Sequence, residues 1–258
     1  MVDARKADYG LCAVVYNLLQ QEEKDMVLPD YWLKRPAGNL DNQARSEFDL
    51  LLTRIKSGGT NALIEYKIPT PRWQFLCHIA EHHGIALHGT GDPNIKIFEP
   101  RKSDDLNPFG NRKAVYAAGD GLWSMFYAVI DRDRYPMSLN NACIRLADAS
   151  GYVSEPRYMF SISQTALRQR PWRTGIVYLL PADTFEAMPP QPFGSYQILV
   201  PQLASLEPVT PLARLEVAPE DFPFLNEIMG HEDSRMEEYA RAMMTGGPWP
   251  DSPPVRPA

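Results

Sequence analysis

Prolines set the first limit on how this sequence can fold, because there are 24 of them in 258 residues. Each proline fixes its own φ angle and lacks a backbone N–H, so it interrupts helices and is confined to the edges of sheets. A chain interrupted this often is not expected to be mostly helical. Apolar residues make up 44% of the chain and charged residues 22%, which is enough to bury a core without cross-links.

Charge and cysteine usage exclude several classes of protein. The formal net charge is −6, which gives no general attraction to phosphate backbones, so bulk nucleic-acid binding is not expected. The three cysteines are widely spaced and form no CxxC pair, so neither a disulfide framework nor a metal site is expected. The N-terminus lacks an apolar signal region, and no stretch is apolar enough to span a bilayer. These features predict a soluble, cytoplasmic protein with no membrane partner.

Three amphipathic helices are predicted in the first third of the chain. Apolar residues recur at helical spacing over residues 8–24, 48–55 and 71–84, and glycines end the last two segments. A short extended segment is predicted over residues 64–68. Residues 1–70 are therefore expected to form a helical N-terminal segment that packs on the rest of the fold or recruits a target.

From residue 85 onward, short apolar runs typical of strands replace the helical pattern. Prolines and glycines separate these runs. The predicted strands cover residues 85–88, 113–118, 158–162, 174–180, 195–200 and 213–217, and one apolar helix covers 120–131. An acidic helix over 220–243 and a disordered tail over 246–258 complete the chain. Because strands follow helices without regular βαβ alternation, the α+β class is predicted.

Several polar residues stand where these elements end or are interrupted. They are His88, Gly89 and Thr90 at the end of the first strand, Arg101 in the next loop, Tyr116 in the second strand, Ser124 and Tyr127 in the helix, and Gln197 in a late strand. Taken singly, each has an ordinary structural explanation, such as a core tyrosine with a bonded hydroxyl or a surface arginine. Their combination is more specific than any one of them.

Together these residues resemble the ADP-ribosyltransferase superfamily, in the branch whose active site is His-Tyr-Glu. In that family the first sheet strand ends in His-Gly-Ser/Thr, which matches His88-Gly89-Thr90. The family's strand tyrosine follows a glycine-containing loop and matches Tyr116, and Ser124 and Tyr127 lie at the family's spacing from it. The resemblance covers roughly residues 85–217. It implies a split antiparallel β-sheet fold of the ADP-ribosyltransferase type over residues 71–245.

The resemblance also implies a role for each residue toward NAD, which would be a substrate. The Gly89 backbone would pair with the nicotinamide carboxamide, helped by the Ser124 hydroxyl, and Tyr116 and Tyr127 would sandwich the ring. Ribose hydroxyls would bond His88 and Thr90, and Arg101 would pair with the adenosine side or the diphosphate. The side chains of His88, Tyr116 and Gln197 are expected to converge on one cleft.

The expected catalytic acid is where this chain departs from the family. Gln197 falls at the position of the usual glutamate and carries no charge. Losing a carboxylate that stabilises a cationic transition state costs a few kcal/mol. Glu186 and Glu207 lie in flanking segments and are alternatives for this position. The departure argues against polymer synthesis and leaves mono-transfer or NAD cleavage.

The sequence therefore predicts a mono-ADP-ribosyltransferase-like enzyme, a glycosyltransferase that cleaves the nicotinamide–ribose bond of NAD. The acceptor is unknown, and a protein is one possibility. One alternative is a catalytically weak module that binds NAD or ADP-ribose. Another is an RNA 2′-phosphotransferase-like enzyme of the same fold, which would need basic residues around His88. A pure interaction protein with a fortuitous motif is a further alternative.

Overall fold

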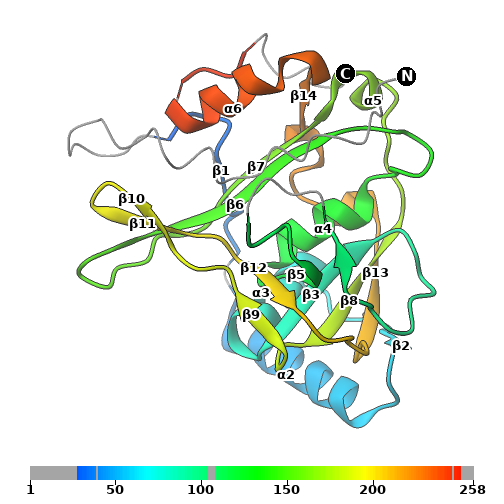
Figure 1. The fold of residues 1–258 in the computed structure, drawn as a ribbon. Coiled ribbons are helices and arrows are strands. Elements are labelled where there is room, and N and C mark those ends of the chain that lie inside the picture. The colour runs from blue at the N-terminus through cyan, green and yellow to red at the C-terminus, as the bar shows by residue number, and fades with distance from the viewer. Residues whose placement is uncertain (1–27, 39, 104–107, 246, 251–258) are drawn as a thin grey trace.

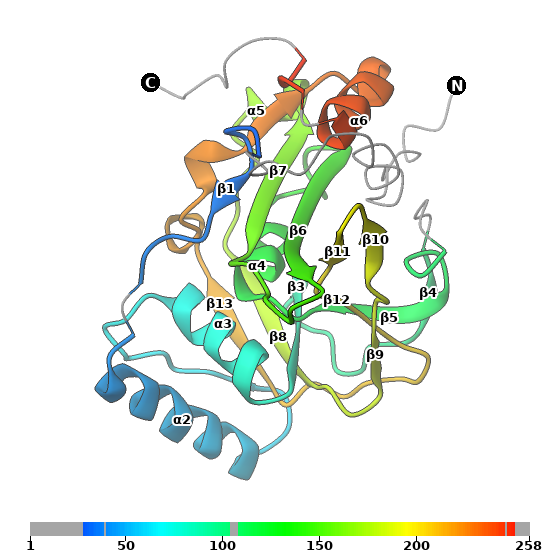
Figure 2. The same ribbon diagram turned by 90° about the vertical axis from the view of Figure 1, so that its left-hand side faces the viewer.

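The computed structural model describes residues 28–38, 40–103, 108–245 and 247–250. It is a mixed α+β structure with two mostly antiparallel sheets, which confirms the predicted class (Figure 1). Helices α2 and α3 lie at one end of the molecule and helix α6 lies at the other (Figures 1 and 2). The helix predicted over residues 8–24 lies outside the described residues.

The larger sheet contains the candidate site and has the strand order β2-β13-β8-β3-β5-β12-β9, with β4 paired to β5. All of its pairings are antiparallel except that of β2 with β13. Its strands in chain order are β2 (Ala62–Leu63), β3 (Ile85–Thr90), β4 (Arg101–Lys102), β5 (Lys113–Ala118), β8 (Gly175–Pro181), β9 (Phe185–Ala187), β12 (Gln202–Ser205) and β13 (Ala213–Val217).

The second sheet has the strand order β1-β7-β6-β11-β10, with β14 paired in parallel to β7. Its strands are β1 (Leu33–Lys34), β6 (Leu139–Asp148), β7 (Arg157–Ser163), β10 (Gln191–Phe193), β11 (Tyr196–Leu199) and β14 (Met229–His231). Strands β1 and β2 come from the predicted N-terminal segment, and each pairs with a strand of the later chain.

Capping aspartates mark where α2 and α4 begin, and apolar residues determine which side of each helix packs on the rest of the fold. The Asp41 side chain accepts a hydrogen bond from Ala44 N and caps α2, and Asp120 caps α4 in the same way through Trp123 N. Nearly all of α4 is buried, because it packs on β3 and β8 of the larger sheet. The helices are α2 (Asn42–Ser57), α3 (Arg72–His82), α4 (Gly121–Val129), α5 (Gln164–Leu167) and α6 (Met236–Thr245).

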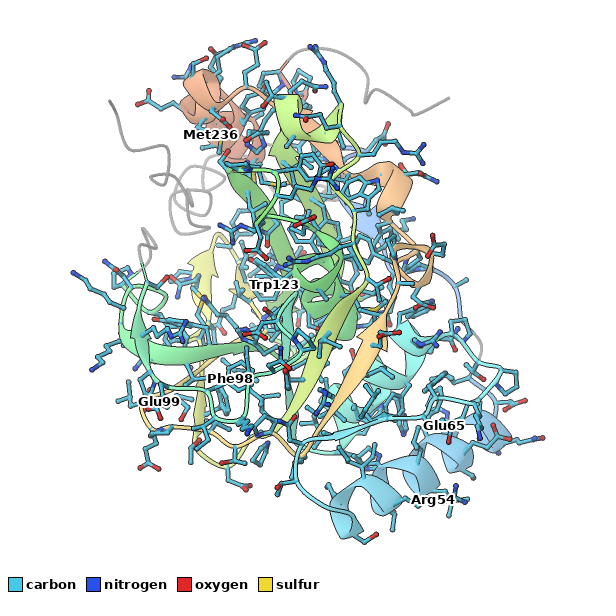
Figure 3. The ribbon with its side chains drawn as sticks, turned by 90° about the vertical axis from the view of Figure 1, so that its right-hand side faces the viewer. Arg54, Glu65, Phe98, Glu99, Trp123 and Met236 are labelled. Atoms are coloured by element: carbon cyan, nitrogen blue, oxygen red, sulfur yellow. The ribbon has the colours of Figure 1, made fainter. Side chains whose placement is uncertain are left out.

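The main core lies around α4. The rings of Phe126, Phe160, Phe222 and Phe224 contact one another there. A smaller apolar cluster around Phe98 and Tyr178 lies on the other face of the larger sheet. Trp123 lies in the middle of the molecule, whereas Arg54 and Glu65 lie at its outer edge near α2 (Figure 3). No helix in these described ranges has the length and apolar run that a membrane crossing requires.

Two expectations for the secondary structure were wrong. The helix predicted over 220–243 begins only at Met236, and short 3₁₀ turns and strand β14 occupy the chain before it. Pro219, Pro223 and Gly230 interrupt the helical pattern there. The extended segment predicted over 64–68 is displaced to Ala62–Leu63.

Part of the predicted disordered tail is described, and Trp249 packs against the ring of Tyr239 at 4.8 Å.

Candidate functional site

Strands β3 and β5 separate at the point where the candidate residues begin. Among the described residues, β3 and β5 are paired at a single position, Leu87 with Ala118. On its other side β3 stays paired with β8 along its whole length. His88, Gly89 and Thr90 therefore lie beyond the last β3–β5 pair, where β8 is the one strand of the described chain that still pairs with β3.

The imidazole of His88 bridges the two separating strands. Its Nδ1 lies 2.7 Å from the backbone oxygen of Tyr116, and because a carbonyl can only accept, Nδ1 carries the proton. Burial lowers the pKa of His88; the hydrogen bond to Tyr116 opposes this, and the charge of Arg101 lowers it further. The ring is therefore neutral at pH 7, and its Nε2 is a hydrogen-bond acceptor.

Gly89 is required by the packing of helix α4. A Cβ atom at this position would lie 1.8 Å from the backbone oxygen of Ser124 and 3.0 Å from the nitrogen of Ala128. No side chain larger than hydrogen fits between β3 and the helix. This packing explains the glycine without any bound ligand, whereas the family resemblance assigned it to ligand approach.

Ser124 and Tyr127 both lie on α4, and both hydroxyls have partners. Ser124 is buried, and its Oγ donates to the backbone oxygen of Gly121 at 2.8 Å. The Tyr127 hydroxyl donates to Oδ1 of Asn141 at 2.9 Å, and Trp123 Nε1 donates to the same oxygen at 2.6 Å. Asn141 on β6 thus fixes both rings, although no sequence pattern pointed to it.

Tyr116 lies on the same face of the larger sheet as α4. Its hydroxyl lies 3.0 Å from the backbone oxygen of Phe109 and 2.9 Å from that of Arg112, so it holds the loop before β5. Because side chains alternate along a strand, the pairing of Leu87 with Ala118 puts Tyr116 and His88 on opposite faces. The His88 ring accordingly packs at 4.7 Å from Phe98 in the smaller cluster.

Thr90 and Arg101 lie near His88. By strand alternation Thr90 shares the face of His88, and its Oγ1 accepts a hydrogen bond from Asp92 N at 3.2 Å. Arg101 is exposed on β4, opposite Ala114 of β5. By their faces the candidate residues form two groups: His88 and Thr90 on one face, and Tyr116, Ser124 and Tyr127 on the other. Arg101 pairs with Ala114, which shares the face of Tyr116, although the charge of Arg101 still acts on His88.

Gln197 lies away from both groups, on the second sheet. It is exposed on β11, opposite Pro192 of β10 and Ala147 of β6. Ala147 is six residues along β6 from Asn141, the partner of Tyr127, which corresponds to about 20 Å. The register therefore does not place Gln197 beside the tyrosine that would stack on nicotinamide. The expectation that His88, Tyr116 and Gln197 converge on one cleft was wrong, because His88 and Tyr116 lie on opposite faces of the larger sheet and Gln197 lies on the second sheet.

Glu186 is the alternative acid that the register aligns with Tyr116. On β12, Ala204 pairs with Tyr116 on one side and with Glu186 on the other, so the three side chains share a face. Two strand spacings put the Cα atoms of Tyr116 and Glu186 roughly 10 Å apart. The Glu186 carboxylate binds Arg112 at 2.8 Å, and the backbone of Arg112 accepts from the Tyr116 hydroxyl. Glu207 is exposed in the turn after β12.

A buried ion network fixes the N-terminus of α4. Arg35 donates to Asp120 at 2.8 Å and to Glu81 at 2.7 Å, and the Tyr158 hydroxyl donates to Asp120 at 2.8 Å. Burial raises the pKa of Tyr158, as does the nearby Asp120 carboxylate, so the hydroxyl keeps its proton. Sequence reasoning missed this network; the position of Asp120 just before the helix was its one local signal.

A second buried cluster contains a serine, a histidine and an aspartate but does not have the geometry of a hydrolase triad. The two ring nitrogens of His231 each lie 2.6 Å from a serine hydroxyl, Ser138 and Ser161. Asp233 accepts from the hydroxyls of Ser138 and Ser163, whereas a triad aspartate binds the ring nitrogen opposite the nucleophile. Burial lowers the pKa of His231 to about 4, so the ring is neutral and structural.

A pocket of about 400 Å³ lies apart from all the candidate residues. It is lined by residues 66, 68–73, 220, 221 and 223. The ion pair between Arg72 and Asp221, at 2.9 Å, already neutralises two of its charged groups. The pocket therefore gives no support to the predicted site.

Comparison with known proteins found no matching family model, no matching curated protein and no matching solved structure. The resemblance to ADP-ribosyltransferases therefore rests on the residues themselves.

Proposed function

We propose that this chain binds NAD and cleaves its nicotinamide–ribose bond, as a mono-ADP-ribosyltransferase-like enzyme with a split-sheet fold of that type. The proposal rests on one observation. The backbones of β3, β5 and α4 meet where β3 and β5 separate: His88 Nδ1 bonds the Tyr116 backbone oxygen, and Gly89 lies against α4, which carries Tyr127. This is the order of elements that the family resemblance implies.

The chemistry of these groups suits a dinucleotide. The neutral His88 ring offers Nε2 as an acceptor for a ribose hydroxyl, and Arg101, whose charge acts on His88, is exposed as a partner for phosphate. Tyr116 and Tyr127 are half-buried on the α4 face, where their rings can contact the nicotinamide. We assign no ligand contact to Ser124, because it is buried and donates within its own helix.

Glu186 takes the role of the acid in this proposal, in place of Gln197. Breaking the nicotinamide bond leaves positive charge on the ribose, which a carboxylate stabilises better than an amide. Glu186 shares a face with Tyr116, and Arg112 holds its carboxylate. Gln197 is neutral and exposed on the other sheet.

A module that binds NAD or ADP-ribose without turnover is the second candidate. The observation that favours it is the placement of the His88 and Tyr116 side chains on opposite faces of one sheet. Binding and bond cleavage are therefore tested separately.

Replacing Tyr127 by alanine should weaken NAD binding by about tenfold. An aromatic stack contributes about 1 kcal/mol beyond the buried area, and the truncated side chain also loses apolar contact. Tyr127→Phe keeps the ring and loses only the hydrogen bond to Asn141, so it should bind nearly as the wild type does. Isothermal titration calorimetry with NAD and the full chain measures both variants.

Tyr152→Ala is the matched control, because Tyr152 is 61% exposed and lies in the turn after β6. It should leave the dissociation constant for NAD unchanged. A wild type that binds no NAD would remove the proposal. So would a Tyr127→Ala variant that binds NAD with wild-type affinity.

A further inference from the structure

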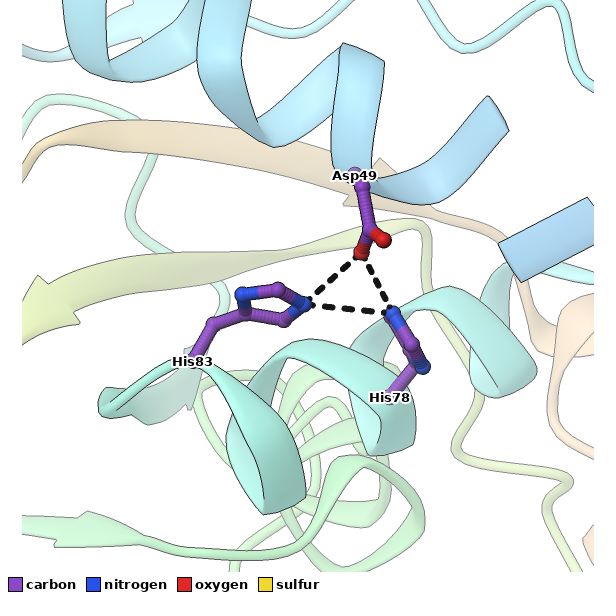
Figure 4. Close-up of side chains that lie close together, drawn as sticks. All are labelled: Asp49, His78 and His83. Carbon is purple, nitrogen blue, oxygen red and sulfur yellow. Dashed lines mark hydrogen bonds and ion pairs between the residues drawn. The ribbon is translucent and has the colours of Figure 1, made fainter. Parts of the chain in front are cut away.

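Three side chains with metal-ligating atoms converge where α2 meets α3. Asp49 lies on α2, His78 lies on α3 and His83 follows the end of α3 (Figure 4). Oδ1 of Asp49 lies 2.8 Å from Nε2 of each histidine, and the two Nε2 atoms lie 3.2 Å apart. None of the three residues belongs to the candidate NAD site.

Hydrogen bonding alone accounts poorly for this arrangement. If both nitrogens carry protons, two N–H groups crowd against each other while pointing at one oxygen. If only one nitrogen is protonated, the lone pair of the other faces the carboxylate oxygen. A cation at the centre would satisfy all three lone pairs at once.

The distances are close to those of a zinc site. Tetrahedral zinc binds imidazole nitrogen and carboxylate oxygen at about 2.0–2.1 Å, which places its ligand atoms roughly 3.3 Å apart. The observed separations of 2.8, 2.8 and 3.2 Å need to open by at most about half an ångström. Two imidazoles and one carboxylate suit zinc and related transition metals, whereas magnesium and calcium prefer oxygen ligands.

The helices hold these ligands firmly on one side and leave them open on the other. His78 is 6% exposed, and its ring packs 5.6 Å from that of Phe48, which α2 buries in the core. The Asp49 side chain is 51% exposed. Three protein ligands with one side toward solvent leave room for a water as the fourth ligand.

We propose that Asp49, His78 and His83 bind one zinc ion that fastens α2 to α3. This proposal does not depend on the proposed NAD chemistry. Nδ1 of His78 is buried and has no hydrogen-bond partner in the described part of the chain. A hydrogen-bond partner on the second ring nitrogen of a zinc-binding histidine strengthens zinc binding by about 10- to 100-fold. Since His78 lacks such a partner among the described residues, the zinc affinity of this site should be moderate.

The test uses the untagged full chain, stripped with a chelator and titrated with zinc chloride alone in a calorimeter. One zinc per chain should bind. At a hundredfold excess of zinc over the dissociation constant, the melting temperature should rise by about 5–10 °C. His83→Ala and Asp49→Asn should each weaken binding at least tenfold, and millimolar magnesium should not compete.

His82→Ala is the matched control, because His82 lies next to His83 but outside the set of three. It should bind zinc as the wild type does. Should His78→Ala fail to fold, the two more exposed ligands, Asp49 and His83, still decide the question. A wild type that takes up no zinc would overturn the proposal. Unchanged zinc affinity in both His83→Ala and Asp49→Asn would also overturn it.

Discussion

Replacing Asp120 by alanine should lower the free energy of unfolding by about 3–5 kcal/mol, because it breaks a buried ion pair from one side only. The change would leave Arg35, whose side chain is 16% exposed, with a charge that Glu81 alone balances. It would also leave the Tyr158 hydroxyl without its acceptor and α4 without its cap at Trp123 N. Urea denaturation followed by circular dichroism measures the loss.

Glu238→Ala provides the comparison, because it removes an ion pair with Arg235 on the exposed surface of α6. Exposed pairs contribute little, so no measurable change in stability is expected there. The loss in free energy of unfolding for Asp120→Asn should lie between the losses for these two variants, since the amide oxygen of asparagine can still cap the helix. A loss below about 1 kcal/mol for Asp120→Ala would mean that the network does not hold α4 in place.

Gly89→Ala should destabilise the protein by about 3 kcal/mol, at the upper end of what overpacking usually costs. The added Cβ would lie 1.8 Å from the backbone oxygen of Ser124, and a backbone atom within a buried helix cannot move aside cheaply. A Cβ added at Gly175 on β8 would likewise lie 2.0 Å from the backbone oxygen of Ala128, so two strands approach α4 closely. Calorimetry should show a melting temperature lower by about 6–12 °C.

Gly119→Ala is the matched glycine substitution one residue beyond β5. The Cβ atom added at Gly119 would have its nearest neighbours in Pro201, at 3.6 Å, which is an ordinary contact distance. Little change in melting temperature is therefore expected. Equal losses for Gly89→Ala and Gly119→Ala would show that a general intolerance of substitution, and not the approach of α4, determines the result.

The elements around the site could be predicted because their signals are local. Strands β3 and β5 are short apolar runs, and α4 is an apolar run that begins after a capping aspartate. Each pattern lies within about ten residues, so no knowledge of distant contacts was needed. The α+β class followed from the order of these patterns along the chain.

Contacts between distant segments could not be predicted in this way. Strand β6 was missed because Asn140 and Asn141 interrupt its apolar run, although pairing with β7 stabilises it. The alignment of Glu186 with Tyr116 depends on the register of β5, β12 and β9, which no local pattern specifies. The opposite placement of His88 and Tyr116 likewise depends on a single pair, Leu87 with Ala118.

Nicotinamide release from NAD tests the central claim most directly, with the wild type, Glu186→Gln and Gln197→Glu compared under the same conditions. The wild type should release nicotinamide, and Glu186→Gln should lower turnover by roughly a hundredfold with little change in the Michaelis constant. Gln197→Glu should leave turnover unchanged, because Gln197 is exposed on the other sheet. No release by the wild type would contradict the account. So would full activity in Glu186→Gln combined with faster release by Gln197→Glu.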